Sequence, residues 1–196
     1  MIFLFGANAL ALSISTELEN AGEQYEILID EEYFSTDRYE GLKVSISQKI
    51  NFRSGDKIIN CIGYGNMHAR QNISNRYKSL GILTSYISPK ATVGPKVHIG
   101  IGTVILGGSY IERGSKVGDG CILWHRSHVC HDAEIGSFSF LAAGSIIGGY
   151  SKIPCFSKLG FNSVIQEKSD LSMNSPINPG ALAFVKRDGS INAMKK

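Results

Sequence analysis

The fold of this chain is decided by residues 105–135, which read ILGGSYIERGSKVGDGCILWHRSHVCHDAEI. An aliphatic residue stands at every sixth position of this stretch, and the same spacing continues beyond both of its ends without a change of register. A series this long and this regular does not arise from chance placement of aliphatic residues. The sixteen positions are Ile87, Val93, Ile99, Ile105, Ile111, Val117, Leu123, Val129, Ile135, Leu141, Ile147, Ile153, Leu159, Ile165, Leu171 and Ile177.

A second column of residues accompanies the first. Four places after each aliphatic residue the chain carries a small residue, with Val97 as the one larger exception. A period of six matches neither an α-helix nor a plain strand, so each hexad predicts a short strand followed by a corner. Three hexads close a triangular coil, which places residue i beside residue i+18. We therefore predict an all-β parallel β-helix of hexapeptide repeats, with the aliphatic column inside it.

The corners of such a coil need residues that tolerate a positive φ. One position before the small residue the chain often carries glycine or asparagine, the residue types that adopt this conformation most readily. These positions are Gly102, Gly108, Gly114, Gly120, Gly144, Asn162, Asn174 and Gly180. The same prism also occurs in ice-binding proteins and in γ-type carbonic anhydrases, so the repeat predicts a fold and not a function.

The first part of the chain follows a different pattern, in which strand-like and helix-like segments alternate. This alternation predicts a small parallel sheet, and hence an α/β Rossmann-like domain over residues 1–84 followed by the β-helix over residues 85–196. The expected strands are 1–5, 25–30, 57–62 and 82–87, and the expected helices are 9–20 and 66–80.

In a parallel sheet the ligand crevice lies beyond the carboxyl ends of the strands. Here it is expected around Gly6, Ala7 and Asn8, at Asp30 and Glu31, and at residues 63–66. The first loop lacks the further glycines of a dinucleotide fingerprint, so a dinucleotide cofactor is not expected. A nucleotide at the helix N-terminus and a purely structural turn both stay open for this loop.

Composition sets broad limits on the class of protein. The chain has 196 residues and a net charge of +3, which argues against dedicated nucleic-acid binding. Its four cysteines are scattered without a CxxC pair, as is typical of reduced thiols in a cytoplasmic protein. The apolar start is too short for a signal peptide or a membrane span, so we expect a soluble cytoplasmic protein without membrane association.

The two halves together resemble the NeuD-like sialic acid O-acetyltransferases, a family that includes N-acetyltransferases of nucleotide-linked amino sugars. The resemblance is carried by Phe5-Gly6-Ala7, by Asp30-Glu31, by Ile62-Gly63 with Arg70, and most specifically by the segment His131-Asp132-Ala133-Glu134-Ile135-Gly136. It implies a left-handed β-helix, acetyl-CoA or another acyl-CoA as co-substrate, and a homotrimer. It also implies that the sugar nucleotide meets Gly6, Ala7, Asn8, Asp30, Glu31, Gly63 and Arg70.

Acyl transfer needs a base that removes the proton of the attacking group, and a histidine suits this task near neutral pH. His131 stands at a coil edge and is the expected base. By resemblance, Asp132 orients its ring. The coil period of 18 places Gly149 beside His131, where the backbone N–H of the glycine can stabilise the oxyanion that forms on the thioester carbonyl.

Three histidines, His125, His128 and His131, lie close together in the sequence. The hexads place His125 and His131 on different faces, so we predict that the three do not bind zinc and that the chain holds no metal ion. Lys158, Lys168, Lys186 and Arg187 are candidate contacts of the CoA phosphates, although each also fits an ordinary exposed charge.

The predicted function is transfer of an acetyl or similar acyl group from acyl-CoA to the amine of a nucleotide-linked amino-deoxy sugar, in the synthesis of bacterial lipopolysaccharide O-antigen or a related surface glycan. Three alternatives stay open: O-acetylation of sialic acid or another glycan hydroxyl, a non-catalytic trimer that binds a nucleotide sugar, and a metal hydratase. The first two stay open because the chain departs from the family pattern at three places. Ala9-Leu10-Ala11 replaces Gly-His-Gly, Trp124 replaces an asparagine, and Phe140 replaces a second histidine.

Overall fold

The chain divides into two compact units, Met1–Thr84 and Ser85–Lys196. The structure is a computed structural model that describes residues 1–34, 42–171, 177–185 and 191–194.

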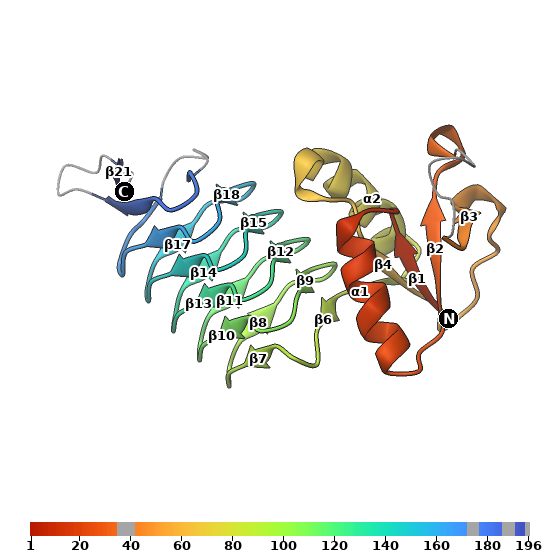
Figure 1. The fold of residues 1–196 in the computed structure, drawn as a ribbon, viewed down its shortest axis with the longest axis horizontal. Helices are drawn as coiled ribbons and strands as arrows, with labels where there is room; N and C mark the ends of the chain where they lie inside the picture. The colour runs from red at the N-terminus through yellow and green to blue at the C-terminus, as the bar shows by residue number, and fades with distance from the viewer. Residues whose placement is uncertain (35–41, 172–176, 186–190, 195–196) are drawn as a thin grey trace. The chain divides into compact units, whose positions relative to one another are not determined.

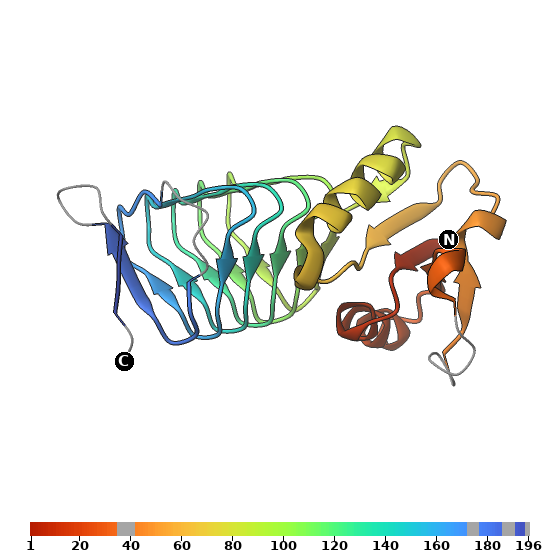
Figure 2. The same ribbon diagram turned by 90° about the horizontal axis from the view of Figure 1, so that it is seen from above.

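The first unit is built on a parallel sheet of five strands in the order β3-β2-β1-β4-β5. Helix α1 packs on β1 and β2, and α2 packs on β4 and β5. Figure 2 shows these two helices on the two faces of the sheet. The elements are β1 Ile2–Phe5, α1 Ala9–Asn20, β2 Tyr25–Ile29, η1 Glu31–Tyr33, β3 Val44–Ile46, η3 Ser47–Lys49, β4 Lys57–Asn60, η4 Tyr64–Asn66, α2 Met67–Ser79 and β5 Leu83–Thr84.

Local sequence explains the first strand and the first helix. The side chains of Phe3, Leu4 and Phe5 are all buried, as expected for a parallel strand covered on both faces. Asn8 caps α1, because its side-chain oxygen accepts hydrogen bonds from the backbone N–H groups of Leu10 and Ala11. Leu10, Ile14 and Leu18 then recur at helical spacing and are buried against the sheet.

The sheet holds one strand that the sequence pattern did not predict. Strand β3 pairs with β2 at its edge, through Ile27 with Val44 and Ile29 with Ile46. Its three residues are too few to show an alternating pattern. The strand order matches five of the six strands of the dinucleotide-binding fold, but α1 and α2 are the only α-helices in the described residues, so a full Rossmann-like domain is not confirmed.

The second unit is a parallel β-helix whose strands stack in three sheets (Figure 1). The strands from β6 to β19 have two residues each, and the four-residue strands β20 and β21 pair antiparallel at its end. Tyr110 pairs with His128 and Ile111 with Val129, so the predicted offset of 18 is confirmed. Strands β7, β10, β13, β16, β19, β20 and β21 form one sheet, β8, β11, β14 and β17 a second, and β6, β9, β12, β15 and β18 a third. The bounds are β6 Tyr86–Ile87, β7 Thr92–Val93, β8 His98–Ile99, β9 Val104–Ile105, β10 Tyr110–Ile111, β11 Lys116–Val117, β12 Ile122–Leu123, β13 His128–Val129, β14 Glu134–Ile135, β15 Phe140–Leu141, β16 Ile146–Ile147, β17 Lys152–Ile153, β18 Lys158–Leu159, β19 Val164–Ile165, β20 Leu182–Val185 and β21 Ile191–Met194.

The predicted aliphatic column forms the core of this unit. From Ile105 to Ile177 its residues belong to one buried cluster, and Ile99 packs against its end. The prediction is wrong for Ile87 and Val93, whose exposed fractions are 42% and 38%. Both stand in the first coil, which is covered by a further coil on one side only, and a repeat buries its core solely against its neighbours.

The small residues at the corners also satisfy backbone groups. The Ser115 hydroxyl is fully buried and donates to the carbonyl of Cys130 at 2.8 Å, and Ser109 donates to that of Trp124 at 3.0 Å. These two buried hydroxyls therefore find acceptors in the next coil, whereas the buried hydroxyl of Ser145 has no hydrogen-bond partner in the described residues.

The residue before the small one adopts a positive φ at the predicted positions that are described, such as Gly102 and Asn162; Asn174 lies outside the described residues. Lys90, which precedes Ala91 in the first coil, does not adopt it. Non-glycine residues, Asp132 among them, also occupy this conformation.

Neither helix of the described segments combines the length and the apolar character that are needed to cross a bilayer.

Candidate active site

The predicted base, His131, lies at the corner that follows strand β13. Its Nδ1 is 3.2 Å from Oδ2 of Asp132, and the side chains of both residues are a little under half exposed. A carboxylate at Nδ1 favours the tautomer that carries its proton on Nδ1 and leaves Nε2 free to accept one. This contact gives His131 the geometry of a general base that faces solvent.

The position of Asp132 depends on its backbone conformation. Asp132 has a φ of 55°, and its N–H donates to the carbonyl of Arg113 in the preceding coil at 3.0 Å. Aspartate tolerates this left-handed conformation better than most residues. Directly beneath it stands Gly114, where a Cβ atom would lie 2.4 Å from Oδ1 of Asp132. The glycine therefore makes room for the carboxylate that contacts His131.

Gly149 lies against the imidazole ring from the next coil. A Cβ atom at position 149 would lie 2.8 Å from Cε1 and 2.9 Å from Nε2 of His131. Within the described residues, the N–H of Gly149 has no hydrogen-bond acceptor. A free backbone donor and a bare Cα atom thus stand beside the basic nitrogen, where a thioester carbonyl can approach.

Glu112 holds the same corner from the coil below, and sequence reasoning missed it. One carboxylate oxygen accepts the backbone N–H of His131 at 2.9 Å, and the other lies 2.7 Å from Nε2 of His128. Burial raises the pKa of Glu112, but the hydrogen bonds from His131 and His128 outweigh burial, so this pKa lies below its ordinary value. The coil period could have revealed this residue, because Glu112 stands 18 positions before Cys130, the residue next to His131.

The first unit contains a cleft of about 460 Å³ at the carboxyl ends of its strands. Of the residues predicted to meet the sugar nucleotide, it is lined by Gly6, Ala7, Asn8 and Asp30. Its wall also includes Ile62, Asn66 and Ile73. The cleft lies where parallel sheets bind their ligands.

Two residues of the first loop fix its shape. Gly6 has a φ of 115°, and a Cβ atom there would lie 3.2 Å from the carbonyl group of Cys61, so only glycine fits this close approach. Besides capping α1, Asn8 donates to the carbonyl oxygen of Cys61 at 2.7 Å. The side chain of Asn8 therefore joins two strand ends and shapes the floor of the cleft.

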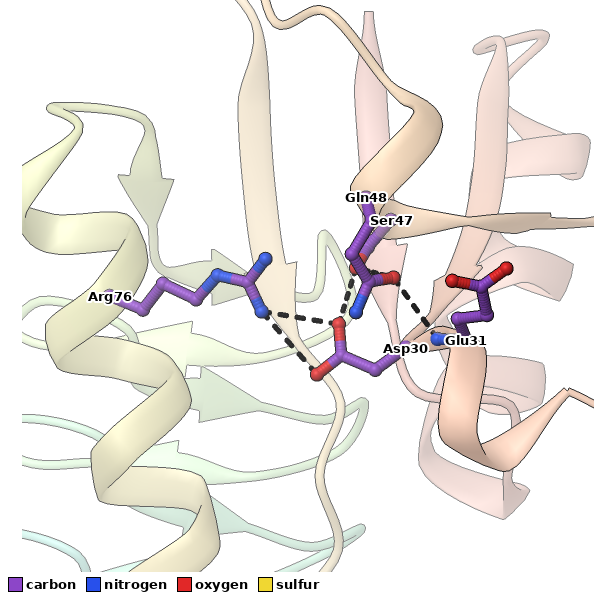
Figure 3. A network of polar contacts seen from close by, with 5 residues as sticks. All are labelled: Asp30, Glu31, Ser47, Gln48 and Arg76. Carbon is purple, nitrogen blue, oxygen red and sulfur yellow. Dashed lines mark hydrogen bonds and ion pairs between the residues drawn. The ribbon is translucent and has the colours of Figure 1, made fainter.

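Asp30 is the charged group that the structure fixes most firmly at this cleft (Figure 3). Its carboxylate accepts hydrogen bonds from Arg76, at 3.1 Å, and from the hydroxyl of Ser47. Neighbouring Glu31 is exposed and is not among the lining residues, although its backbone N–H donates to the side chain of Gln48 at 3.0 Å. Of the predicted acidic pair, Asp30 faces the cleft.

Two other predicted contacts, Gly63 and Arg70, are not among the lining residues. Arg70 is fully buried, and its guanidinium donates to the carbonyls of Asn60 at 2.5 Å and Ile62 at 3.0 Å. A guanidinium placed in this way holds the backbone that leaves β4 and has no access to a ligand. The expected substrate contact of Arg70 is therefore corrected to a structural role.

Part of this chain matches a known family of proteins. The family model "Bacterial transferase hexapeptide (six repeats)" matches residues 114–149, which include His131, Asp132 and Gly149. The chain has the hexapeptide-transferase fold. No curated protein matches it in sequence.

Solved structures share this hexapeptide-transferase fold over nearly the whole chain. The acetyltransferase domain of PglB from Neisseria gonorrhoeae is 22% identical, with a TM-score of 0.80 over 92% of this chain and 89% of that one. The same domain in complex with acetyl coenzyme A is 21% identical, with a TM-score of 0.75 over 93% and 94%. PerB from Caulobacter crescentus, in complex with CoA and GDP-perosamine, is 17% identical, with a TM-score of 0.55 over 97% and 96%. These structural neighbours agree with the resemblance of the sequence to the NeuD-like and nucleotide-amino-sugar acetyltransferases.

The candidate CoA contacts lie on the second unit or outside the described residues. Lys158 is exposed on β18. Lys168 pairs with Glu167 at 3.1 Å, and its Nζ lies 5.9 Å from the ring centre of Tyr150. The centres of the Tyr150 and His131 rings lie 5.0 Å apart in an edge-on arrangement, so Lys168 is connected to His131 through Tyr150. Lys186 and Arg187 lie outside the described residues.

Proposed function

We propose that this chain is an acyl-CoA-dependent acyltransferase that acetylates the amine of a nucleotide-linked amino-deoxy sugar in bacterial surface-glycan synthesis. The observation that carries the proposal is the corner where His131, oriented by Asp132, meets the bare backbone of Gly149. The shared fold with acetyltransferases supports the same class of reaction.

The chain's own residues account for each step of a direct transfer. The neutral sugar amine attacks the thioester carbonyl while Nε2 of His131 takes a proton from the amine nitrogen. The carbonyl oxygen becomes an oxyanion, which the N–H of Gly149 stabilises. When the tetrahedral intermediate collapses, the carbon–sulfur bond breaks and CoA leaves as a thiolate, which the His131 imidazolium protonates. The step produces an amide and needs no acyl-enzyme.

The cleft of the first unit supplies the recognition of the sugar nucleotide. Its glycine-containing loop and the start of α1 provide backbone groups for a phosphate, as at other helix N-termini. Asp30 is a fixed acceptor for a ribose hydroxyl or a base N–H, in the position that an acidic residue takes in nucleotide-binding sheets. PerB, which shares the fold, is solved with a nucleotide-linked amino sugar and CoA.

A homotrimer would complete the acyl-CoA site. Outward-facing residues of one sheet form a column, and Tyr110, Ile146 and Leu182 in this column are exposed by 37–45%. Exposed apolar side chains in line are typical of a surface that another copy covers. The column borders the corner of His131, so a second copy on it would wall the groove for acyl-CoA.

The proposal is tested by release of free thiol from acetyl-CoA with a panel of UDP-, dTDP- and GDP-linked amino sugars. We expect turnover with an amino sugar, and a fall of roughly 10²–10⁴-fold in kcat for His131→Ala. His125→Ala is the matched control, because His125 holds the equivalent place one hexad earlier and is not followed by an acid. Its activity should stay near that of the unmodified chain.

Other outcomes separate the alternatives. Turnover of a hydroxyl acceptor with no turnover of any amine would replace N-acylation by O-acylation. Binding of the sugar nucleotide without binding of acetyl-CoA would favour the non-catalytic trimer. Full activity in His131→Ala would keep the class of enzyme and reject the mechanism.

A further inference from the structure

Three potential metal ligands meet beside the proposed base. His128 and Cys130 flank Val129, whose side chain points into the core and is fully buried. Because side chains alternate along a strand, His128 and Cys130 both point outward. Glu112 lies one coil below Cys130, as its backbone N–H donates to the carbonyl of Val129 at 2.8 Å. One ligand atom from each of the three residues lies within 4.8 Å of the other two.

This set differs from the three histidines that the sequence brought under consideration. His125 is turned to its own coil edge, where its Nδ1 lies 3.3 Å from the carbonyl oxygen of Gly107. The ring of His131 contacts Asp132 and Tyr150. The new set therefore uses only His128 of the earlier three and adds a carboxylate and a thiol.

A carboxylate, an imidazole and a thiolate are ligands that Zn²⁺ accepts in tetrahedral sites. The three atoms need to move by roughly 1 Å to reach Zn–ligand distances of about 2.0–2.3 Å. The carboxylate is already oriented, because its second oxygen accepts the N–H of His131 at 2.9 Å. Glu112 and His128 are about one third exposed, which leaves a path for the ion.

We propose that Glu112, His128 and Cys130 bind one zinc-class divalent ion, through a carboxylate oxygen, Nε2 and the thiolate. On binding, the Cys130 thiol releases its proton to solvent, and Glu112 exchanges its bond with His128 for the ion. The other oxygen of Glu112 stays on the His131 N–H. Three protein ligands leave the fourth position of a tetrahedral site for a water molecule.

The test uses Co²⁺ as the probe on the full chain after treatment with a chelator. A thiolate bound to Co²⁺ gives an intense near-ultraviolet charge-transfer absorption. We expect this absorption to saturate at one Co²⁺ per chain and to be displaced by Zn²⁺. Cys130→Ser should abolish it, and Glu112→Gln and His128→Gln should each weaken Co²⁺ binding by roughly tenfold or more.

Cys155→Ser is the matched control, because Cys155 is the exposed cysteine of the chain and lies outside the group. It should keep the absorption unchanged. Absence of a thiolate–cobalt band in the unmodified chain, or its persistence in Cys130→Ser, would overturn the proposal. Circular dichroism of each variant separates a lost ligand from a lost fold. The readout is binding, so its failure is independent of whether the chain transfers acyl groups.

Discussion

Gly149 lies so close to His131 that no side chain fits between them: a Cβ atom would come within 2.8–2.9 Å of the imidazole ring. The φ of Gly149 is not positive, so its backbone conformation does not require glycine. Glycine is required because the neighbouring imidazole ring leaves no room for a side chain. Because no side chain separates them, the basic nitrogen of His131 can lie next to the backbone N–H of Gly149. The following predictions test this relationship and the parts of the molecule that support it.

Gly149→Ala should leave the fold intact and lower kcat by about tenfold or more, because displacing reacting groups by 1 Å is costly in catalysis. The imidazole must move to make room for the methyl group. Steady-state kinetics with acetyl-CoA and an amino-sugar nucleotide measure the effect. Circular dichroism of the variant separates a lost activity from a lost fold. An unchanged kcat in Gly149→Ala would show that the ring contact has no catalytic role.

Asp30→Asn should raise KM for the sugar nucleotide by roughly tenfold and leave KM for acetyl-CoA unchanged, because a charge-assisted hydrogen bond to the ligand is lost. Arg76 and Ser47 hold the carboxylate in place, so the change acts on a fixed acceptor. The matched control is Glu31→Gln, which alters the exposed neighbour outside the lining. A rise in both KM values, or a larger effect in Glu31→Gln, would remove Asp30 from the site.

Glu112→Gln should lower the free energy of unfolding at neutral pH by roughly 1 kcal/mol. The folded pKa of Glu112 lies below its ordinary value of 4.5, so its stabilising contribution is complete above that value and is lost as the pH falls through the folded pKa. The difference between the two proteins should therefore shrink at acid pH. Urea denaturation of chelator-treated protein at several pH values measures it.

Glu134→Gln provides the comparison for Glu112. The pKa of Glu134 is also lowered, first by the hydrogen bond from Lys116, but both side chains of this pair are well exposed. Exposed ion pairs contribute little to stability. A larger loss in Glu134→Gln than in Glu112→Gln would contradict the assigned role of Glu112.

The four cysteines should react with a thiol reagent in a fixed order. Cys155 is exposed and should react first, followed by Cys130, whose pKa is raised by partial burial and then by the charges of Glu112 and Glu167. Cys61 and Cys121 should react only after unfolding, because both are fully buried and burial raises the pKa of Cys61 to about 12. Cys155→Ser should remove the fast phase alone. A fast phase that survives this substitution would contradict the described burial.

Lys96→Gly should stabilise the protein by roughly 0.5–1 kcal/mol, because glycine adopts the left-handed conformation without the steric cost that lysine bears. Lys96 is exposed and has a φ of 60°. Thermal unfolding measures the gain. Lys90→Gly is the control: Lys90 is also exposed but has no positive φ, so the added backbone freedom should destabilise the variant. Stabilisation of both variants would point to the loss of charge instead.

The β-helix and the corner where His131 meets Gly149 could be predicted because their determinants are local and repeat. Each hexad carries its own inward aliphatic residue and corner residue, and the offset of 18 then places Gly149 beside His131. The first unit was harder to predict. Strand β3 is too short for a pattern, and burial of Arg70 follows from carbonyls of residues 60 and 62 that only the folded chain brings to it.

The sequence by itself therefore determined the repeat, the register, the aliphatic core from Ile105 onward and the corner of His131, since a strict period fixes which residues stack. The tertiary structure alone decided which side chains meet across the coils. It turned Glu112 toward His131 and His128, and it directed Asp30 but not Arg70 to the cleft. The reason is physical: a repeat fixes where each Cα atom stands, whereas the direction of a polar side chain depends on the donors and acceptors around it.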